Sequence, residues 1–183
     1  MNDQMNQEEP TTVPSGIPLL DDQATEDPTA PVNEVFIITG MSGAGRTGAA
    51  RALEDLDWYV VDNLPPAMIP ALVGMMSPDG AGVHRLAVVV DARSRSYFSD
   101  LTKTLEQLKD TGALYRVIFL EASAEALVKR YENNRRPHPM QAGGTLLDGI
   151  AAEKSLLAPV RRIADEIIDT SRMNVHDLTR HIR

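Results

Sequence analysis

The residues whose types and spacing could do chemistry begin with a short glycine-rich stretch. In order they are Gly40, Met41, Ser42, Gly43, Ala44, Gly45, Arg46 and Thr47. The pattern is a glycine, four further residues, a glycine, a basic residue and a residue with a hydroxyl group. Glycines let successive backbone N–H groups face one concave space, and a following helix adds its unpaired amides and the positive end of its dipole. Because phosphate oxygens suit such a nest, the stretch predicts a phosphate-binding loop.

Arg46 departs from this pattern, because such loops usually carry lysine at that position. Lysine offers a compact charge to the β- and γ-phosphates, whereas the arginine fork is bulkier and aims its donors differently. Hydrolysis depends on accurate placement of the transferred group, so we expect binding to survive better than hydrolysis. The Thr47 hydroxyl is expected to bind Mg²⁺, a hard cation that takes oxygen ligands.

Two aspartates that follow apolar runs are candidates for the second acidic position. Asp91 comes directly after three valines in "LAVVVDARS", and we expect it to hold the Mg²⁺ shell together with Thr47. The alternative is a turn-forming residue that caps the next segment. Asp62 ends another apolar run in "VVDNLPP". It could be a base for a substrate hydroxyl, a metal-shell partner, or a helix-entry residue before Pro65.

A basic cluster lies where a helical pattern runs into prolines, in "KRYENNRRPHP". We expect Arg130, Arg135 and Arg136 to form a lid that closes over phosphates and supplies positive charge from the far side. The alternative is a solvated helix terminus that complements the helix dipole. If phosphate transfer occurs, the residues expected to take part in it are Arg46, Asp91 and Arg136.

Five short apolar runs alternate with helical patterns along the chain. The runs lack inside–outside alternation, which is typical of strands covered on both faces in a parallel sheet. They cover Val35–Thr39, Trp58–Val61, Arg85–Asp91, Tyr115–Glu121 and Glu166–Asp169. Helices are expected over about 46–56, from Pro65, from about 97 to 112, from Ser123, over about 145–164 with a bend at Pro159, and after Asn174. This alternation predicts an α/β three-layer sandwich with right-handed crossovers.

Composition sets the outer limits of this interpretation. The chain has 183 residues, room for one domain of ordinary size. Residues 1–33 are rich in Pro, Thr, Asp, Glu and Gln and are predicted to be a disordered acidic tail, with the folded domain over 34–183. The net charge is -8, but residues 1–34 hold eight acids and no Lys or Arg, so the remainder is electrically balanced and offers nucleic acid no strong basic face.

Other chemistries are excluded or unsupported by the sequence. There are no cysteines, which excludes thiolate metal sites and cysteine nucleophiles. The four histidines, among them His138 between two prolines, show no metal-ligand spacing. No window is apolar for the roughly 20 residues of a membrane helix, and the N-terminus lacks the order of a secretion signal. A cytoplasmic protein with no membrane contact is expected.

Four segments occur in an order that closely resembles the RapZ-type nucleotide-binding family, the RNase adapter proteins. They are "TGMSGAGRTGAARALEDLDWYVVDNLPP", "VVVDARS", "LVKRYENNRRPHP" and "EKSLLAPVRRIADEIIDTSRMNVHDL", and the likeness covers about residues 35–183. The resemblance implies an adenylate-kinase-like P-loop NTPase domain that binds ATP and GTP and hydrolyses them slowly. It carries nucleotide contacts over to Gly40–Thr47 and, for GTP, to Asp91, Ala92, Arg93 and Ser94.

The same resemblance implies RNA or a ribonuclease as a partner and favours a homo-oligomer. These duties lean on a C-terminal domain of the family, and the chain is expected to end where the family's first half ends. We therefore expect a nucleotide-binding regulatory domain with weak ATPase or GTPase activity. The alternatives are a small-molecule kinase, with Asp62 as base and the segment Pro65–Met76 covering an acceptor, and an RNA-binding adapter whose nucleotide site is vestigial.

Overall fold

A computed structural model describes residues 34–76, 83–90, 96–134, 137–141 and 143–182. The acidic tail predicted for residues 1–33 lies outside these ranges. The strands are β1 (Glu34–Gly40), β2 (Tyr59–Asp62), β3 (Arg85–Val89), β4 (Leu114–Glu121) and β5 (Glu166–Asp169). The helical segments are α1 (Arg46–Glu54), the 3₁₀ turn η1 (Pro66–Met68), α2 (Ile69–Val73), α3 (Tyr97–Lys109), α4 (Ala124–Asn134), α5 (Leu146–Ile163) and α6 (Val175–Ile182).

All strand pairs are parallel, in the order β2-β3-β1-β4-β5, so β1 is the central strand. The chain runs from β1 to the edge strand β2, returns through β3, and crosses β1 to reach β4 and β5. The carboxyl ends of β3 and β4 therefore flank the carboxyl end of β1. In open α/β sheets ligands bind in the crevice at such a switch point, and the glycine-rich stretch begins there.

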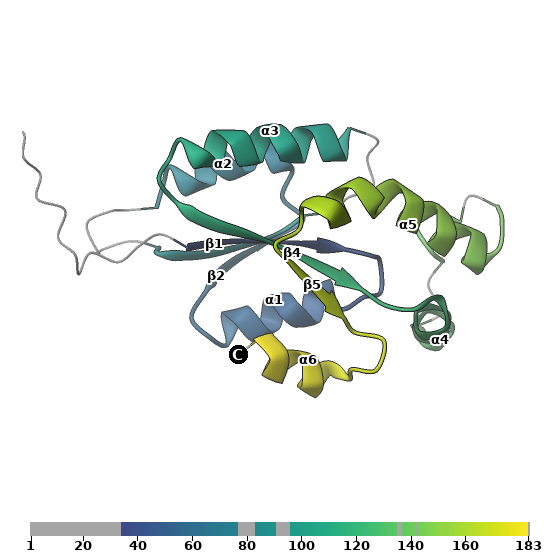
Figure 1. Ribbon diagram of the computed structural model, residues 1–183. Helices are drawn as coiled ribbons and strands as arrows, with labels where there is room; N and C mark the ends of the chain where they lie inside the picture. The colour runs from purple at the N-terminus through teal and green to yellow at the C-terminus, as the bar shows by residue number, and fades with distance from the viewer. Residues whose placement is uncertain (1–33, 77–82, 91–95, 135–136, 142, 183) are drawn as a thin grey trace, which may run out of the picture.

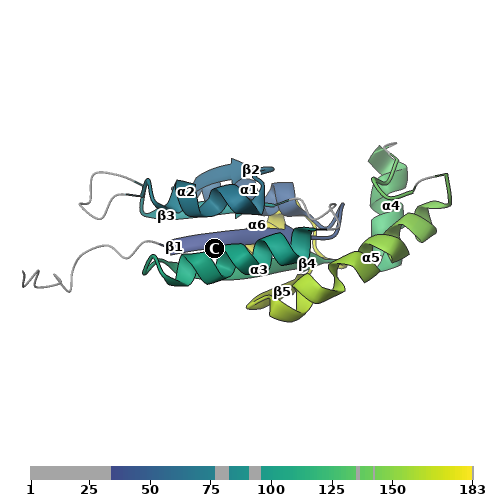
Figure 2. The same ribbon diagram turned by 90° about the horizontal axis from the view of Figure 1, so that it is seen from above.

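Helices cover both faces of this sheet, which confirms the predicted three-layer α/β sandwich. Figure 1 shows α2, α3 and α5 on one face, α1 and α6 on the other, and the sheet between them. The view from above places α4 beyond the end of the sheet, next to one end of α5 (Figure 2). Among the described residues, no helix is both long enough and apolar enough to cross a membrane.

The core is aliphatic and centres on β1 and its two neighbours, as the apolar runs predict. Ile37, Val88 and Val117 are fully buried on three adjacent strands. The predicted boundaries differ in small ways. Trp58 precedes β2 instead of beginning it, because its amide donates to the carbonyl of Leu53 in α1 at 3.1 Å; its ring stacks on Phe36 with centroids 4.2 Å apart. The predicted helix from Pro65 is divided into η1 and α2.

Local side-chain contacts fix the helix ends near the site. Asn174 and Asp177 exchange hydrogen bonds at the start of α6, since each side chain accepts from the other residue's backbone amide, at 3.0 and 3.1 Å. Thr145 and Asp148 form the equivalent capping box at the start of α5. Such reciprocal caps satisfy amides that a helix N-terminus leaves unpaired. α5 continues through Pro159 as one helix.

Candidate functional site

The loop Gly40–Thr47 leaves the carboxyl end of β1, and its three glycines all have a positive φ. Gly40 has φ +134°, and a Cβ there would lie 2.0 Å from the carbonyl oxygen of Leu120 on β4. Gly45 has φ +105° and is the N-cap residue of α1. A side chain at Gly40 would push the loop off the sheet, and one at Gly45 would strain the turn into the helix.

Backbone amides of this loop are open to a ligand. α1 begins without a side-chain cap, so its first amides have no capping acceptor. Within the described ranges, the amides of Gly43, Gly45 and Thr47 have no hydrogen-bond acceptor from the protein. Met41 and Ala44, in contrast, donate to the carbonyls of Leu120 and Met41. The unpaired amides and the helix dipole together make an anion site of the kind that binds phosphate.

Arg46 lies at the first position of α1 and reaches toward the neighbouring strand. Its Nη1 donates to the carbonyl oxygen of Val90 at 3.2 Å. Val90 itself is fixed beside β1, because its amide donates to the carbonyl of Ile38 at 2.9 Å. The guanidinium charge is thus held between the loop and the end of β3.

The predicted Mg²⁺ pair, Thr47 and Asp91, is only partly within the described residues. Thr47 is exposed on the first turn of α1, and its hydroxyl has no partner in the described part of the chain. Asp91, Ala92, Arg93 and Ser94 lie outside it. In the described ranges no group of three or more His, Asp or Glu side chains forms a metal site. The structure therefore describes one of the two expected Mg²⁺ ligands, the hydroxyl of Thr47.

Arg130, predicted as a lid residue, contacts the loop from α4. Its guanidinium donates to the carbonyl of Gly43 at 3.0 Å, to that of Thr170 at 2.6 Å and to that of Met173 at 3.4 Å. These contacts place a positive charge beside the loop while holding the loop in place. The other two predicted lid residues, Arg135 and Arg136, lie outside the described residues.

Thr170, just after β5, supports the loop from beneath. Its hydroxyl lies 2.8 Å from the carbonyl oxygen of Ala44 and accepts from Nη1 of Arg130 at 3.1 Å. The preceding residue, Asp169, is exposed, and its pKa is lowered because the hydroxyl and amide of Ser171 donate to its carboxylate, with the charges of Arg172 and Arg130 adding to the effect. The hydrogen bond from Thr170 to Ala44 therefore ties the loop to the segment that links β5 to α6.

A cavity of about 360 Å³ opens beside the loop. It is lined by the loop backbone, by mainly apolar side chains that follow β5, and by one cationic side chain, that of Arg130. The lining residues are Gly43, Ala44, Gly45, Gly48, Arg130, Thr170, Met173, Asn174, Val175 and Leu178. Ligand sites are commonly apolar cavities with a few polar groups, and this one adjoins the unpaired amides.

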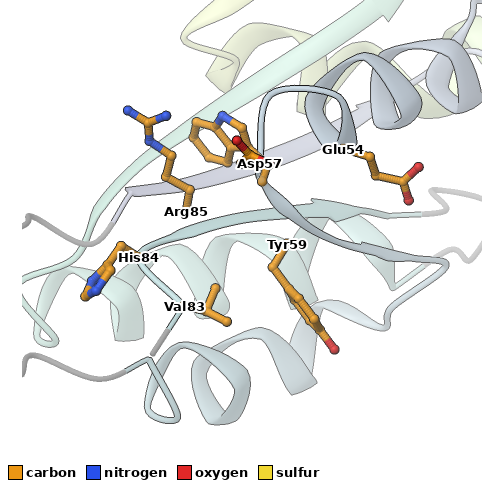
Figure 3. A pocket seen from close by; sticks show the side chains of 7 residues that line it. Glu54, Asp57, Tyr59, Val83, His84 and Arg85 are labelled. Atoms are coloured by element: carbon orange, nitrogen blue, oxygen red, sulfur yellow. The ribbon is translucent and has the colours of Figure 1, made fainter. Parts of the chain in front are cut away.

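Another cavity, of about 620 Å³, lies at the opposite end of the sheet (Figure 3). It is lined by residues at the starts of β2 and β3 and at the end of α1, including Glu54, Tyr59 and His84. Arg85 lies over the Trp58 ring at 5.9 Å. Because the amino ends of parallel strands are not where open α/β sheets bind ligands, we take the loop cavity as the candidate site.

Neither Asp62 nor His138 lines the loop cavity, and two residues that support the loop had no predicted role. Asp62 is exposed at the end of the edge strand β2, with β3 between it and β1. His138 is buried against α5, where it contacts Glu153, and Glu153 contacts Ser42 of the loop. Neither Glu153 nor Thr170 was assigned a role from the sequence. For Glu153 the signal was an acid on the apolar face of a helix.

The family described as RapZ-like N-terminal domain matches residues 33–183. A nucleotide-binding protein of Kocuria rhizophila is 51% identical over 172 residues, covering 94% of this chain and 55% of that protein. A nucleotide-binding protein of Bifidobacterium adolescentis is 53% identical over 146 residues, covering 80% of this chain and 47% of that protein. The chain spans about half the length of the curated relatives it matches.

Solved structures of lower identity share the fold. A shikimate kinase from Acinetobacter baumannii has a TM-score of 0.52 at 16% identity, over 82% of this chain and 90% of that one. A tunicamycin resistance protein of Deinococcus radiodurans has a TM-score of 0.51 at 16% identity, over 82% of this chain and 93% of that one. At these identities the likeness shows a shared P-loop kinase-like fold and nothing about substrate.

Proposed function

The chain belongs to the RapZ-like N-terminal domain family, and from this premise we propose that it binds ATP or GTP and hydrolyses it weakly. The observation that carries the proposal is the set of amides at Gly43, Gly45 and Thr47, which have no acceptor in the described part of the chain and lie at the carboxyl end of the central strand. The polyphosphate would lie on these amides, with the guanidinium of Arg130 close by. The adjacent cavity of about 360 Å³ offers the nucleoside an apolar wall.

Mg²⁺ belongs to this proposal through two oxygen ligands, Thr47 and Asp91. The exposed hydroxyl of Thr47, which has no partner among the described residues, fits the preference of Mg²⁺ for oxygen. The ion would neutralise phosphate charge when bound. We also propose nucleotide contacts for Ala92, Arg93 and Ser94, and lid contacts for Arg135 and Arg136.

The contact of Arg46 supports binding more strongly than turnover. Its guanidinium donates to the Val90 carbonyl, so part of its hydrogen-bonding capacity is directed at the protein. A charge held there attracts polyphosphate, whereas catalysis requires donors aimed at the group being transferred. Weak hydrolysis fits a regulatory domain whose partner contacts follow its nucleotide state.

Calorimetric titration of ATP and of GTP, each with and without Mg²⁺, tests the proposed site. The variant is Gly45→Ala, in which the new Cβ lies at φ +105° and 3.0 Å from Leu178 Cδ2. The matched control is Gly112→Ala, which also places a Cβ at a positive φ, +71°, but in open space after α3. We expect affinity to fall in Gly45→Ala and to persist in the control. Equal affinity in the two variants would remove the loop as the binding site.

A small-molecule kinase is the second candidate function, and the position of Asp62 supports it. Asp62 is exposed at the carboxyl end of β2, with η1 and α2 following at once. A screen of hydroxyl acceptors with ATP separates the two functions. A phosphorylated acceptor would indicate a kinase, while phosphate released without any acceptor indicates an NTPase.

The downstream role is proposed from the resemblance to RNase adapter proteins, with RNA or a ribonuclease as partner. Residues 35–183 carry no net charge, so attraction to RNA would have to come from local groups such as the arginines near the end of α4. Measuring the affinity for a small RNA at two salt concentrations, with and without nucleotide, tests this role. A nucleotide-independent affinity would argue against nucleotide control of the contact.

A further inference from the structure

Glu153 of α5 is a buried carboxylate that contacts the phosphate loop. The residue is only 3% exposed. Its Oε2 accepts a hydrogen bond from the backbone amide of Ser42 at 3.0 Å, and its Oε1 accepts one from the Ser42 hydroxyl at 2.6 Å. Both carboxylate oxygens therefore bind a single loop residue, although 111 positions separate the two in sequence.

His138 completes this cluster from the turn that precedes α5. The amide of Met140 donates to His138 Nδ1 at 3.1 Å, so Nδ1 is an acceptor and the proton of the ring lies on Nε2. Nε2 lies 3.1 Å from Oε2 of Glu153 and donates to it. Glu153 thus accepts three hydrogen bonds, and the dipoles of these three donor groups stabilise its negative charge.

The contact between this turn and α5 depends on a glycine. A Cβ at Gly149 would lie 2.9 Å from His138 Nδ1 and 3.1 Å from the backbone of Gln141. The turn therefore approaches the helix more closely than any larger residue would allow. The Tyr131 ring of α4 lies against His138, with centroids 5.1 Å apart. Packing on both sides thus fixes the position of the imidazole.

Helix packing alone does not account for an acid at this position. The other residues on this face of α5, Ile150, Leu157 and Val160, are apolar and buried. A buried carboxylate is costly unless its oxygens are hydrogen-bonded, and an apolar residue would cover the sheet without that cost. What Glu153 adds is the placement of Ser42, the residue directly before the first unpaired amide, that of Gly43.

We propose that Glu153 is a positioning residue for phosphate binding: it holds Ser42 so that the amides from Gly43 onward face the ligand. This inference rests on the proposed nucleotide binding. Both donors of Ser42 are directed to the carboxylate, so the phosphates bind the later amides and Ser42 acts as the anchor of the loop. His138 keeps the carboxylate in place. The contact between His138 and Glu153 therefore links the turn that precedes α5 to the phosphate site.

The test compares Glu153→Gln with Leu157→Val, a substitution one turn further along the same buried face of α5. Glutamine keeps the size of the side chain but loses its charge and replaces one acceptor oxygen with a donor, so at most two of the three donors keep an acceptor. Both variants are expected to lower stability in urea. Only Glu153→Gln should weaken Mg·ATP binding by the folded protein, by about tenfold, the factor for one lost hydrogen bond to a charged group.

Ser42→Ala is the milder variant, because it removes the hydroxyl and keeps the amide. We expect its binding defect to lie between those of the wild type and Glu153→Gln, and we expect the double variant to be no weaker than Glu153→Gln alone, since both act through one contact. Fully additive defects, or wild-type affinity in Glu153→Gln, would overturn the positioning role. If Glu153→Gln does not fold, Ser42→Ala still tests the role.

Hydrogen exchange of the loop amides in the free protein separates failure of this inference from failure of the proposed function. A wild type that binds neither ATP nor GTP would refute the proposed function. The positioning role would still predict faster exchange of the amides of residues 42–47 in Glu153→Gln and in Ser42→Ala. It predicts no loop-specific increase in exchange in Leu157→Val. Loop exchange equal to that of the wild type in the two cluster variants would refute positioning.

Discussion

Thr170→Val is the most direct test of how the phosphate loop is supported. Valine keeps the β-branched shape of threonine and replaces the hydroxyl with a methyl group. In the structure that hydroxyl lies 2.8 Å from the Ala44 carbonyl oxygen and 3.1 Å from that of Glu121, and it accepts from Arg130 at 3.1 Å. The change therefore removes a buried link between the loop and the end of β5.

The expected loss follows from counting partners. A hydroxyl has one proton, and the Ala44 carbonyl is the nearer acceptor, so the Thr170 hydroxyl donates to it. Valine at position 170 leaves this carbonyl without its donor, and Ala44 is 0% exposed. Arg130 keeps three carbonyl acceptors, so its loss is small. One unsatisfied buried acceptor costs about 1–3 kcal/mol. From the middle of this range, about 2 kcal/mol, burial of the added methyl group returns up to about 0.8 kcal/mol, so we expect a net loss of about 1–2 kcal/mol.

Urea unfolding measures this loss, with Thr170→Ser as the control. Serine keeps the hydroxyl and gives up a methyl group, so it should lose about 0.8 kcal/mol, less than valine. The midpoint should fall in Thr170→Val while the slope with urea stays constant, which would indicate a change in stability alone. The reasoning would be refuted by a Thr170→Val protein within about 0.5 kcal/mol of the wild type, the range of a harmless substitution. It would equally be refuted if serine were as damaging as valine.

Three further predictions concern the loop and the helix ends. Arg46→Lys is expected to raise the rate of phosphate release at saturating nucleotide with little change in affinity, because lysine frees the charge from the Val90 carbonyl; an unchanged or lower rate would contradict this. Thr145→Ala is expected to lower the free energy of unfolding by about 1 kcal/mol, because the Thr145 hydroxyl accepts from the amide at the third position of α5; a thermal melt equal to that of the wild type would count against this cap. Asp169 has a pKa below its ordinary value of 3.8, so its contribution to stability is full above that value and is lost as the pH falls through the lowered pKa. Asp169→Asn should therefore flatten the acid limb of the stability–pH curve, and an identical limb would refute the assignment.

Much of the fold could be predicted because it depends on short-range patterns. The apolar runs predicted all five strands, since buried parallel strands need apolar side chains on both faces. The spacing of Gly40, Gly45 and Thr47 predicted a loop between a strand and a helix, and the positive φ angles confirm the need for glycine. The last helix was predicted to begin after Asn174, and in the structure Asn174 and Asp177 cap it.

The supports of the loop could not be predicted in this way, because each depends on contacts between distant parts of the chain. Thr170 hydrogen-bonds to a loop residue 126 positions away, and no local pattern marks it as buried. Glu153 carried a visible signal, an acid in an apolar helical stripe, but the sequence does not show which donors surround it. Arg130 was predicted to face phosphates, and its contacts with three carbonyls followed only from the structure.

The distance along the chain between the loop and its supports bears on how the protein is made. The glycine turn leaves the ribosome early, whereas Glu153 and Thr170 follow more than a hundred residues later. Translation proceeds at about 5–20 residues per second, so for several seconds the nascent loop lacks the groups that hold it. A growing polypeptide that has not yet released β5 should therefore be unable to capture a nucleotide, and loading of the site would begin only as synthesis of this domain ends.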